Sequence, residues 1–146
     1  MFVIDAFIGN WDRHNGNWGF LYNQETDKLE IAPIFDCGSA LFPQIDDELI
    51  KKVVSSKAEM NARVYDIPTS AIFIDGKRAN YHKVITSLEF KDCNNAIKRI
   101  VPKIQLDDIN KLIDNVEELS QLKKEFLKKI LKLRKELILD AAFKKL

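Results

Sequence analysis

Four polar residues in the first quarter of the chain have types and spacing suited to chemistry at an oxygen atom. Asp12, His14 and Asn17 lie in the loop GNWDRHNGNWGFL (residues 9–21), and Asp36 lies further along in IFDCG. A carboxylate can accept a proton from a hydroxyl group. A carboxylate and an amide oxygen side by side suit a hard cation such as Mg²⁺. The set therefore contains a candidate base and two candidate metal ligands.

Two strand-like segments must position these residues. Residues 18–22 (WGFLY) and 29–34 (LEIAPI) are rich in strand-forming residues, and the polar stretch NQETDK separates them. Pro33 lacks an N–H group, so the second strand should end there or lie at an edge. The sequence therefore predicts an antiparallel β-hairpin directly after the polar loop.

The register of this hairpin decides which polar residues meet. With a turn centred between residues 26 and 27, Phe20 lies near Pro33. Extending the pairing outward brings Asn17 beside Asp36. We therefore expect the candidate base and the candidate ligands to gather at the open end of the hairpin.

The rest of the chain is predicted to be largely helical. The expected helices cover residues 2–8, parts of 45–63, 81–88, a segment capped by Asp92 and running to Val101, a segment capped by Asp107 and running through Val116, and a final helix with an apolar stripe from Leu119 to Ala142. That stripe is broader than a coiled-coil seam and favours packing on a core. The predicted fold class is α+β, mainly α, in one domain of residues 1–146.

Composition narrows the class of protein. The chain has 146 residues, 46% of them hydrophobic and 31% charged, with a net charge of +1, so bulk charge favours neither a nucleic-acid partner nor a membrane. Residues 1–50 have a local charge of −7 and residues 120–146 one of +6. The acidic end suits a cation, although a solvated face is the simpler interpretation. The two separated cysteines and the lack of a signal sequence or membrane span predict a cytoplasmic protein.

The two motifs together resemble those of protein kinases. An Asp and an Asn five residues apart, followed after a hairpin by Asp-x-Gly, is the kinase arrangement, represented here by Asp12, Asn17 and Asp36. The order DRH, in place of HRD, resembles phosphatidylinositol kinases and the HipA-type serine/threonine kinases of bacterial toxin–antitoxin systems. The pair GNWDRHNGNWGFL and IAPIFDCGSAL is most similar to the HipA-like group over roughly residues 7–41.

This resemblance implies a function and a role for each residue. It implies the C-terminal lobe of a HipA-like, protein-kinase-like fold that phosphorylates a Ser or Thr hydroxyl on a protein with Mg²⁺ and ATP. Asp12 would be the catalytic base, and His14 a supporting polar residue of the catalytic loop. Asn17 and Asp36 would hold the metal and, through it, the nucleotide phosphates.

One part of the kinase pattern is missing from the sequence. Only eleven residues precede Asp12, and the five glycines form no Gly-rich phosphate loop. We therefore expect a catalytic lobe without its N-terminal ATP-clamping lobe, inactive alone, whose partners are a protein substrate and either that lobe or an antitoxin-like protein.

Other functions are compatible with the same residues. The chain can be a non-catalytic relic lobe that works as a protein-binding module. A metal-dependent phosphohydrolase would use Asp12, His14 and Asp36. Such an enzyme would need further His or Asp metal ligands, and the chain has only two histidines. A lipid kinase fits the DRH order, although no basic headgroup loop is present. The simplest alternative is a turn rich in Asp and Asn with an unrelated Asp36.

Overall fold

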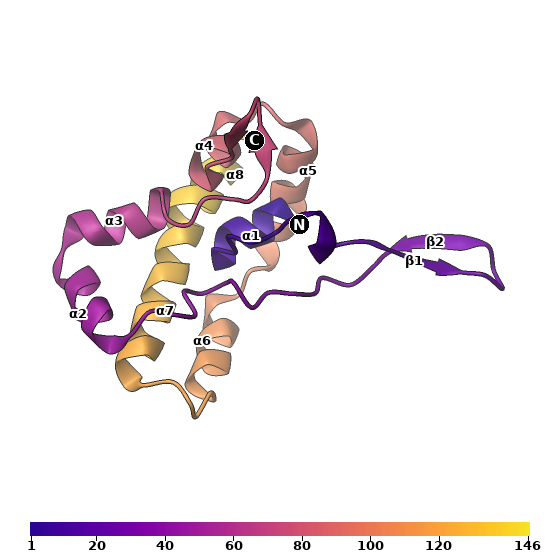
Figure 1. Cartoon of the computed structure of the whole chain (residues 1–146). Helices are drawn as coiled ribbons and strands as arrows, with labels where there is room; N and C mark the ends of the chain where they lie inside the picture. Colours follow the sequence, from indigo (N-terminus) through magenta and orange to yellow (C-terminus); the bar gives the residue numbers. More distant parts are fainter.

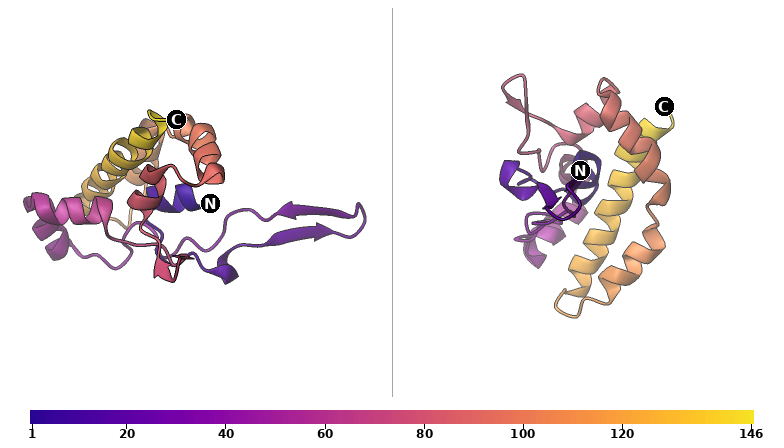
Figure 2. Two further views of the ribbon diagram at one scale, coloured as in Figure 1. Left: turned by 90° about the horizontal axis from the view of Figure 1, so that it is seen from above. Right: turned by 90° about the vertical axis from the view of Figure 1, so that its right-hand side faces the viewer.

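The computed structural model describes residues 1–146 as a helical body from which one β-hairpin projects (Figure 1). The hairpin consists of β1 (Phe20–Asn23) and β2 (Lys28–Ile31). Figure 2 shows the hairpin on one side of the body, with α2 (Asp47–Ser55) and α3 (Lys57–Tyr65) on the opposite side. The molecule is therefore elongated by a single extension near its N-terminal end.

The body is built from short helices around one long one. Its elements are α1 (Phe2–Ile8), the 3₁₀ turn η1 (Asn15–Asn17), α2, α3, a small hairpin of β3 (Phe73–Ile74) and β4 (Lys77–Arg78), α4 (Tyr81–Ser87), α5 (Lys91–Ile100), the 3₁₀ turn η2 (Val101–Lys103), α6 (Leu106–Asp114), α7 (Gln121–Arg134), the π-helical segment η3 (Lys135–Asp140) and α8 (Ala141–Phe143). None of these helices has the length and apolar character needed to cross a membrane.

Side-chain caps fix where several of these helices begin. Asp46 and Ser120 each accept a hydrogen bond from the backbone N–H three residues on, as N-cap residues do. Two predicted caps were wrong. Asp92 and Asp107 lie inside the first turns of α5 and α6, after the N-cap residues Phe90 and Gln105. Carboxylates at these positions still favour the helices, because they face the positive end of the helix dipole.

The core forms around α7. Its buried face consists of Phe126, Leu127, Ile130 and Leu131, and α7 contacts α1, α2, α3 and α6. The stripe continues through η3, where Ile138 and Leu139 are buried. The predicted packing of the last helix on the core is therefore confirmed. Because α1 is part of this core, the loop that follows α1 starts from a fixed position.

The hairpin register differs from the predicted one. Phe20 pairs with Ile31 rather than lying near Pro33, so the turn is centred one residue earlier, between residues 25 and 26. Asn23 explains this shift, because its side-chain oxygen accepts hydrogen bonds from the two backbone N–H groups that follow Gln24. The shift of two residues between partners leaves each side chain on its expected face of the hairpin.

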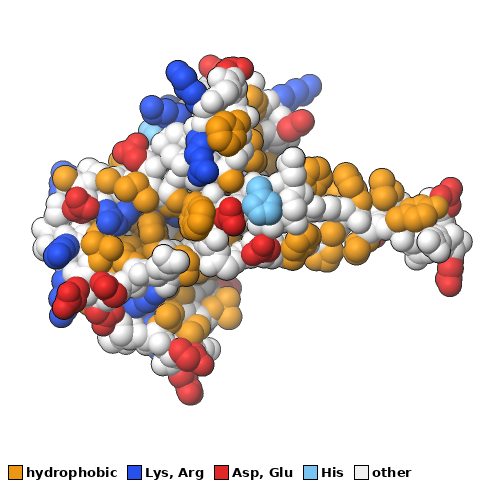
Figure 3. All heavy atoms as spheres, viewed as in Figure 1, with side chains coloured by type: hydrophobic (Ala, Val, Ile, Leu, Met, Phe, Trp, Pro, Cys, Tyr) orange, Lys and Arg blue, Asp and Glu red, His pale blue; other side chains and the backbone are white.

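Both faces of the hairpin are exposed. The exposed fractions are 56% for Phe20, 57% for Leu21, 63% for Leu29 and 74% for Ile31, although all four side chains are apolar. Successive strand residues point to opposite faces, so neither face packs on the body. Figure 3 shows hydrophobic side chains along much of the extension, with acidic side chains at its tip. The hairpin thus presents apolar surface that the body does not cover.

Candidate active site

The polar loop begins at a glycine that no other residue can replace without strain. Gly9 caps the end of α1 with a left-handed backbone conformation, φ 67°. A Cβ atom at this position would lie 1.9 Å from Nη1 of Arg134, a buried side chain at the end of α7. The direction in which the chain leaves α1 is therefore set by α7.

A buried ion pair holds the loop against α1. Arg13 donates from Nε to Oδ2 of Asp5 at 3.1 Å and from Nη2 to Oδ1 at 3.1 Å. Asn10 adds a bond from Nδ2 to the same carboxylate at 3.2 Å. All three side chains are buried, and the bond to Asp5 raises the pKa of Arg13. The loop is thus fixed by buried polar contacts.

The same guanidinium joins the two arms of the hairpin at their base. Nη1 of Arg13 donates to the backbone oxygen of Asn17 at 2.7 Å and to that of Phe35 at 2.6 Å. Nη2 also donates to Sγ of Cys37 at 3.4 Å. The residues on both sides of Asp36 are therefore bound to the cation that holds Asn17. An arginine, rather than the strand pairing that we expected, therefore connects the two chain segments.

Asn17 is oriented with its amide oxygen available. Its Nδ2 donates to the backbone oxygen of Asp12 at 2.8 Å, which fixes which end of the amide faces the loop. Its Oδ1 makes no hydrogen bond within the protein. A buried amide held in this way directs one oxygen away from the loop, as a metal ligand requires.

The carboxylates of Asp12 and Asp36 have no donor within the protein. Asp12 is half-buried and Asp36 is exposed. Asp36 has a left-handed backbone conformation, φ 52°, which costs on the order of 1 kcal/mol for a residue with a Cβ atom. Both carboxylates are therefore free to meet a ligand.

His14 has a local structural role in this structure. Its Nδ1 accepts a hydrogen bond from the backbone N–H of Gly16 at 3.0 Å and so caps η1, the short turn that carries Asn17. This bond requires an imidazole without a proton on Nδ1. The ring itself is exposed. His14 thus supports the position of a candidate ligand.

Two anchors of the loop were not predicted from the sequence. The hydroxyl of Tyr81 in α4 donates to the backbone oxygen of Asn10, and burial raises the pKa of Tyr81 to about 12. Asp5 was the other. A signal for Asp5 exists, because it is the only charged residue in the apolar helix FVIDAFI. Tyr81 has no such signal, since it lies 71 residues away from its partner.

The two tryptophans of the polar loop are partly exposed. Trp11 is 45% and Trp18 is 41% exposed. Trp18 stacks edge-on against Phe20, with ring centres 5.8 Å apart, at the start of the hairpin. Trp11 borders a cavity of the body. The two tryptophans therefore have different surroundings, one at the hairpin and one at the cavity.

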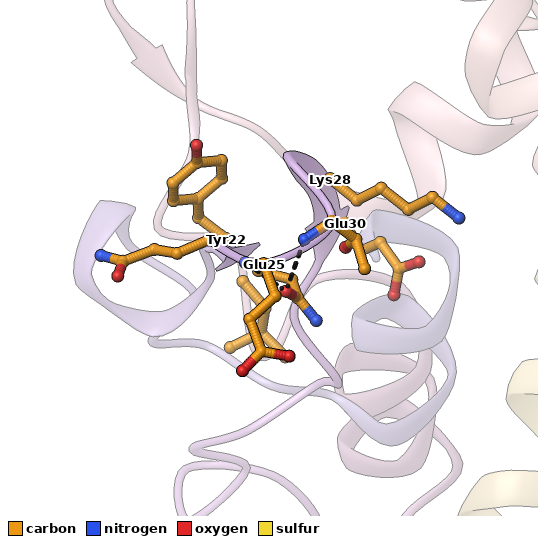
Figure 4. A pocket seen from close by; sticks show the side chains of 8 residues that line it. Tyr22, Glu25, Lys28 and Glu30 are labelled. Carbon is orange, nitrogen blue, oxygen red and sulfur yellow. Dashed lines mark hydrogen bonds between the residues drawn. The ribbon is translucent and has the colours of Figure 1, made fainter.

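Another hollow of the molecule lies on the hairpin. It has a volume of about 870 Å³ and is lined only by hairpin residues from Leu21 to Glu30. In Figure 4 the side chains of Tyr22, Glu25 and Lys28 point in different directions rather than toward a common point, and all three residues are exposed. It contains none of the four candidate residues and has the open shape of a bare strand surface. We therefore do not assign the chemistry to it.

The chain is similar to a kinase over nearly its whole length. It is 48% identical over 143 residues to the serine/threonine-protein kinase CtkA of Helicobacter pylori, and the match covers 97% of this chain and 44% of CtkA. A crystal structure described as that of a Helicobacter pylori proinflammatory kinase CtkA superposes with a TM-score of 0.91 at 46% identity, covering 99% of this chain and 50% of that one. No protein-family model matches.

These comparisons confirm the predicted fold class. The mainly helical body with small antiparallel hairpins matches the kinase-like C-terminal lobe in the CtkA structure. The chain spans about half the length of this relative. The roles of Asp12, His14, Asn17 and Asp36 stay predictions, because a match in overall sequence and fold does not test individual side chains.

Proposed function

We propose that this chain is the catalytic lobe of a protein serine/threonine kinase that uses Mg²⁺ and ATP. The observation that carries the proposal is the contact of one Arg13 nitrogen with the backbone oxygens of both Asn17 and Phe35. It brings the loop of the candidate base to the segment of Asp36. The similarity to a serine/threonine-protein kinase supports the same function.

In this proposal Asp12 accepts the proton of the substrate hydroxyl. As the hydroxyl oxygen forms its bond to the γ-phosphorus of ATP, the bond from that phosphorus to the β-phosphate oxygen breaks, and ADP leaves. The carboxylate of Asp12 suits this role because no protein donor occupies it. The backbone N–H of Asp12 is bonded to Oδ1 of Asn10 at 3.2 Å, which restrains the loop at the reacting residue.

Asn17 and Asp36 would hold Mg²⁺. Their free Oδ1 and carboxylate are the hard oxygen ligands that Mg²⁺ prefers, and two protein ligands suit an ion that keeps waters and binds phosphate oxygens. When bound, the ion neutralises charge on the phosphates. The contribution of His14 would be to keep Asn17 in place through the cap of η1.

A second lobe must complete the ATP site. Catalysis of phosphoryl transfer depends almost entirely on positioning and electrostatic stabilisation, and this sequence has no Gly-rich loop. The uncovered apolar hairpin is the surface that we assign to contact with such a lobe, whether joined to this chain or separate. An antitoxin-like partner stays a prediction from the resemblance alone.

The first test uses the 146 residues alone with Mg²⁺ and radiolabelled ATP. We expect no phosphate transfer above the background of a sample without protein. Joining the chain to the part of CtkA that it does not match should restore transfer. Robust transfer by the chain alone would show that it contains an ATP clamp we have not identified.

The second test separates the roles of the residues in this joined protein. Asp12→Asn should lower phosphorylation by at least about 10³-fold, because it removes the base, and leave ATP affinity nearly unchanged. Asp36→Asn and Asn17→Ala should weaken Mg²⁺-dependent ATP binding by roughly tenfold or more. Asn15→Ala, in the same loop, is the control. For each variant, calorimetry measures the affinity for ATP with and without Mg²⁺, and a phosphorylation assay measures the activity. Full activity in all variants would contradict the kinase proposal.

One observation favours a second candidate function. The exposed apolar hairpin would also suit a non-catalytic binding module. That function predicts normal partner binding by Asp12→Asn and no phosphate transfer under any conditions. The activity of the joined protein therefore decides between the two functions.

A further inference from the structure

A cavity of the body lies next to the candidate site. It has a volume of about 660 Å³, and Trp11, which directly precedes Asp12, forms part of its wall. Gly38, two residues after Asp36, borders it as well. Phe42 and Leu49 add apolar surface between the loop and α2. A ligand in this cavity would therefore lie beside the residues that we assign to catalysis.

A buried cation without an acidic partner lies behind the cavity wall. Arg134 is only 3% exposed and makes no salt bridge. Its guanidinium lies over the ring of Phe42 at 5.2 Å, and its Nη2 donates to the backbone oxygens of Arg63 and Ile67 at 2.9 Å each. These three residues all border the cavity, as does Gly9, which faces Nη1.

Capping a helix uses only part of the hydrogen-bonding capacity of the Arg134 guanidinium. The two carbonyl groups that it binds lie at the C-terminal end of α3, where a cation is favourable. That role uses Nη2 alone. Nε is buried without any hydrogen-bond partner, and Nη1 makes none within the protein. Arg13, by contrast, has partners for all its nitrogens. Burial lowers the pKa of Arg134 to about 10, so it stays charged at neutral pH.

A second basic side chain, that of Lys123, binds the wall of the cavity. Lys123 donates from Nζ to the backbone oxygens of Pro43 and Ile45 at 3.2 Å each, and both residues border the cavity. Lys123 has no carboxylate partner, and no residue that lines the cavity is acidic. A carboxylate that entered on this side would have Lys123 at the wall and Arg134 behind it, and neither cation has a carboxylate partner in the protein. Charges in such partly apolar surroundings interact more strongly than in water.

We propose that this cavity binds an acidic peptide segment of the acceptor protein, one with a carboxylate next to an apolar side chain. The apolar side chain would pack against Trp11 and Phe42, and the carboxylate would face Lys123 and the side of the wall behind which Arg134 lies. The identification of the ligand as an acceptor protein rests on the proposed kinase function. The preference for acidic peptide rests only on the cavity.

Binding can be measured on the 146-residue chain without nucleotide. Trp18→Phe leaves Trp11 as the only tryptophan, because the chain has two, and its emission then reports on the cavity. The probes are a capped peptide AELSLEA and its neutral counterpart AQLSLQA. We expect a saturable change with the first and at least tenfold weaker binding of the second. Equal binding of both peptides, or of neither, would overturn the proposal.

A pair of adjacent lysines provides the protein control. Lys123→Met should weaken binding of the acidic peptide by at least threefold. Lys124→Met should not, because Nζ of Lys124 binds the backbone oxygen of Asp114 and not a cavity residue. Both lysines are partly buried, so loss of packing affects them alike. Equal effects of the two substitutions would contradict a role for the cavity charges.

The same assay separates this proposal from the kinase proposal. Asp12→Asn should leave peptide affinity unchanged, since no step of phosphoryl transfer occurs in the assay. If peptide binding fails while the joined protein still phosphorylates, the cavity assignment alone is wrong. If the acidic peptide binds but neither the chain nor the joined protein transfers phosphate, the cavity assignment stands and the kinase proposal is wrong.

Discussion

The base and the strands of the long hairpin invert the usual distribution of polar and apolar residues. At the base, Asp5, Asn10 and Arg13 are charged or polar and fully buried. Along the strands, Phe20, Leu29 and their apolar neighbours are more than half exposed. Isolated domains normally bury the second kind of residue and expose the first. This contrast is what the proposed site at the base and the proposed contact of the strands with a second lobe would require.

The base of the hairpin is stabilised by contacts within the chain, whereas the apolar surface of the strands is not covered by it. A buried ion pair is stable only when its remaining donors and acceptors are also satisfied. Arg13 meets this condition entirely within the chain, through Asp5, Asn17, Phe35 and Cys37. The apolar side chains of the strands are not buried in the same way, because a two-stranded hairpin needs a third strand or another element to bury one of its faces.

The largest expected effect comes from breaking the base. Arg13→Met should lower the free energy of unfolding by about 3–5 kcal/mol, since it leaves the carboxylate of Asp5 buried without its cation. Urea unfolding followed by circular dichroism measures this. The double variant Asp5→Leu with Arg13→Met should recover part of the loss. A single-variant loss below about 1 kcal/mol would show that the base is not held by this pair.

The second prediction compares one substitution in the two regions. Leu131→Ala, in the buried face of α7, should cost about 2–5 kcal/mol of unfolding free energy. Leu29→Ala, on the exposed strand, should change it by less than about 0.5 kcal/mol. Similar losses at both positions would mean that the hairpin packs on the body in solution.

Leu29 also tests what the hairpin is for. With the remaining part of CtkA supplied as a separate chain, Leu29→Ala together with Ile31→Ala should weaken association by at least roughly tenfold, about 1.4 kcal/mol. Glu25→Ala at the turn is the control from the same hairpin. Unchanged association, measured by surface plasmon resonance, would remove the lobe-contact role of the strands.

The smallest expected effect concerns the two thiols. Cys37 is exposed at the base, whereas Cys93 is half-buried and burial raises its pKa. At pH 8 the raised pKa leaves fewer Cys93 side chains as thiolates than an exposed cysteine would have, and burial also limits access to the sulfur. Iodoacetamide should therefore modify Cys37 several-fold faster than Cys93. Mass spectrometry of partly labelled protein measures both rates. The difference should shrink as the pH rises, because more of Cys93 ionises. A faster Cys93 would contradict the burial of α5.

The sequence by itself determined the features that depend on neighbouring residues. Spacing of apolar residues located the helices, because side chains three and four apart share a helix face. The spacing of Asp12, Asn17 and Asp36 around a hairpin indicated where the two segments meet. The predicted hairpin register was wrong, because the turn is centred one residue earlier than predicted. The side chain of Asn23 closes this turn, and strand propensity does not report that contact.

Only the tertiary structure decided what holds the site in place. The contacts of Asp5 with Arg13, of Tyr81 with Asn10 and of Arg134 with Gly9 join segments whose separation is set by packing of α1 against α4 and α7. A polar side chain has the same appearance in the sequence whether its donors meet water or a carbonyl group. Its partners exist only once the core has formed, and so the inversion between base and strands is a property of the fold.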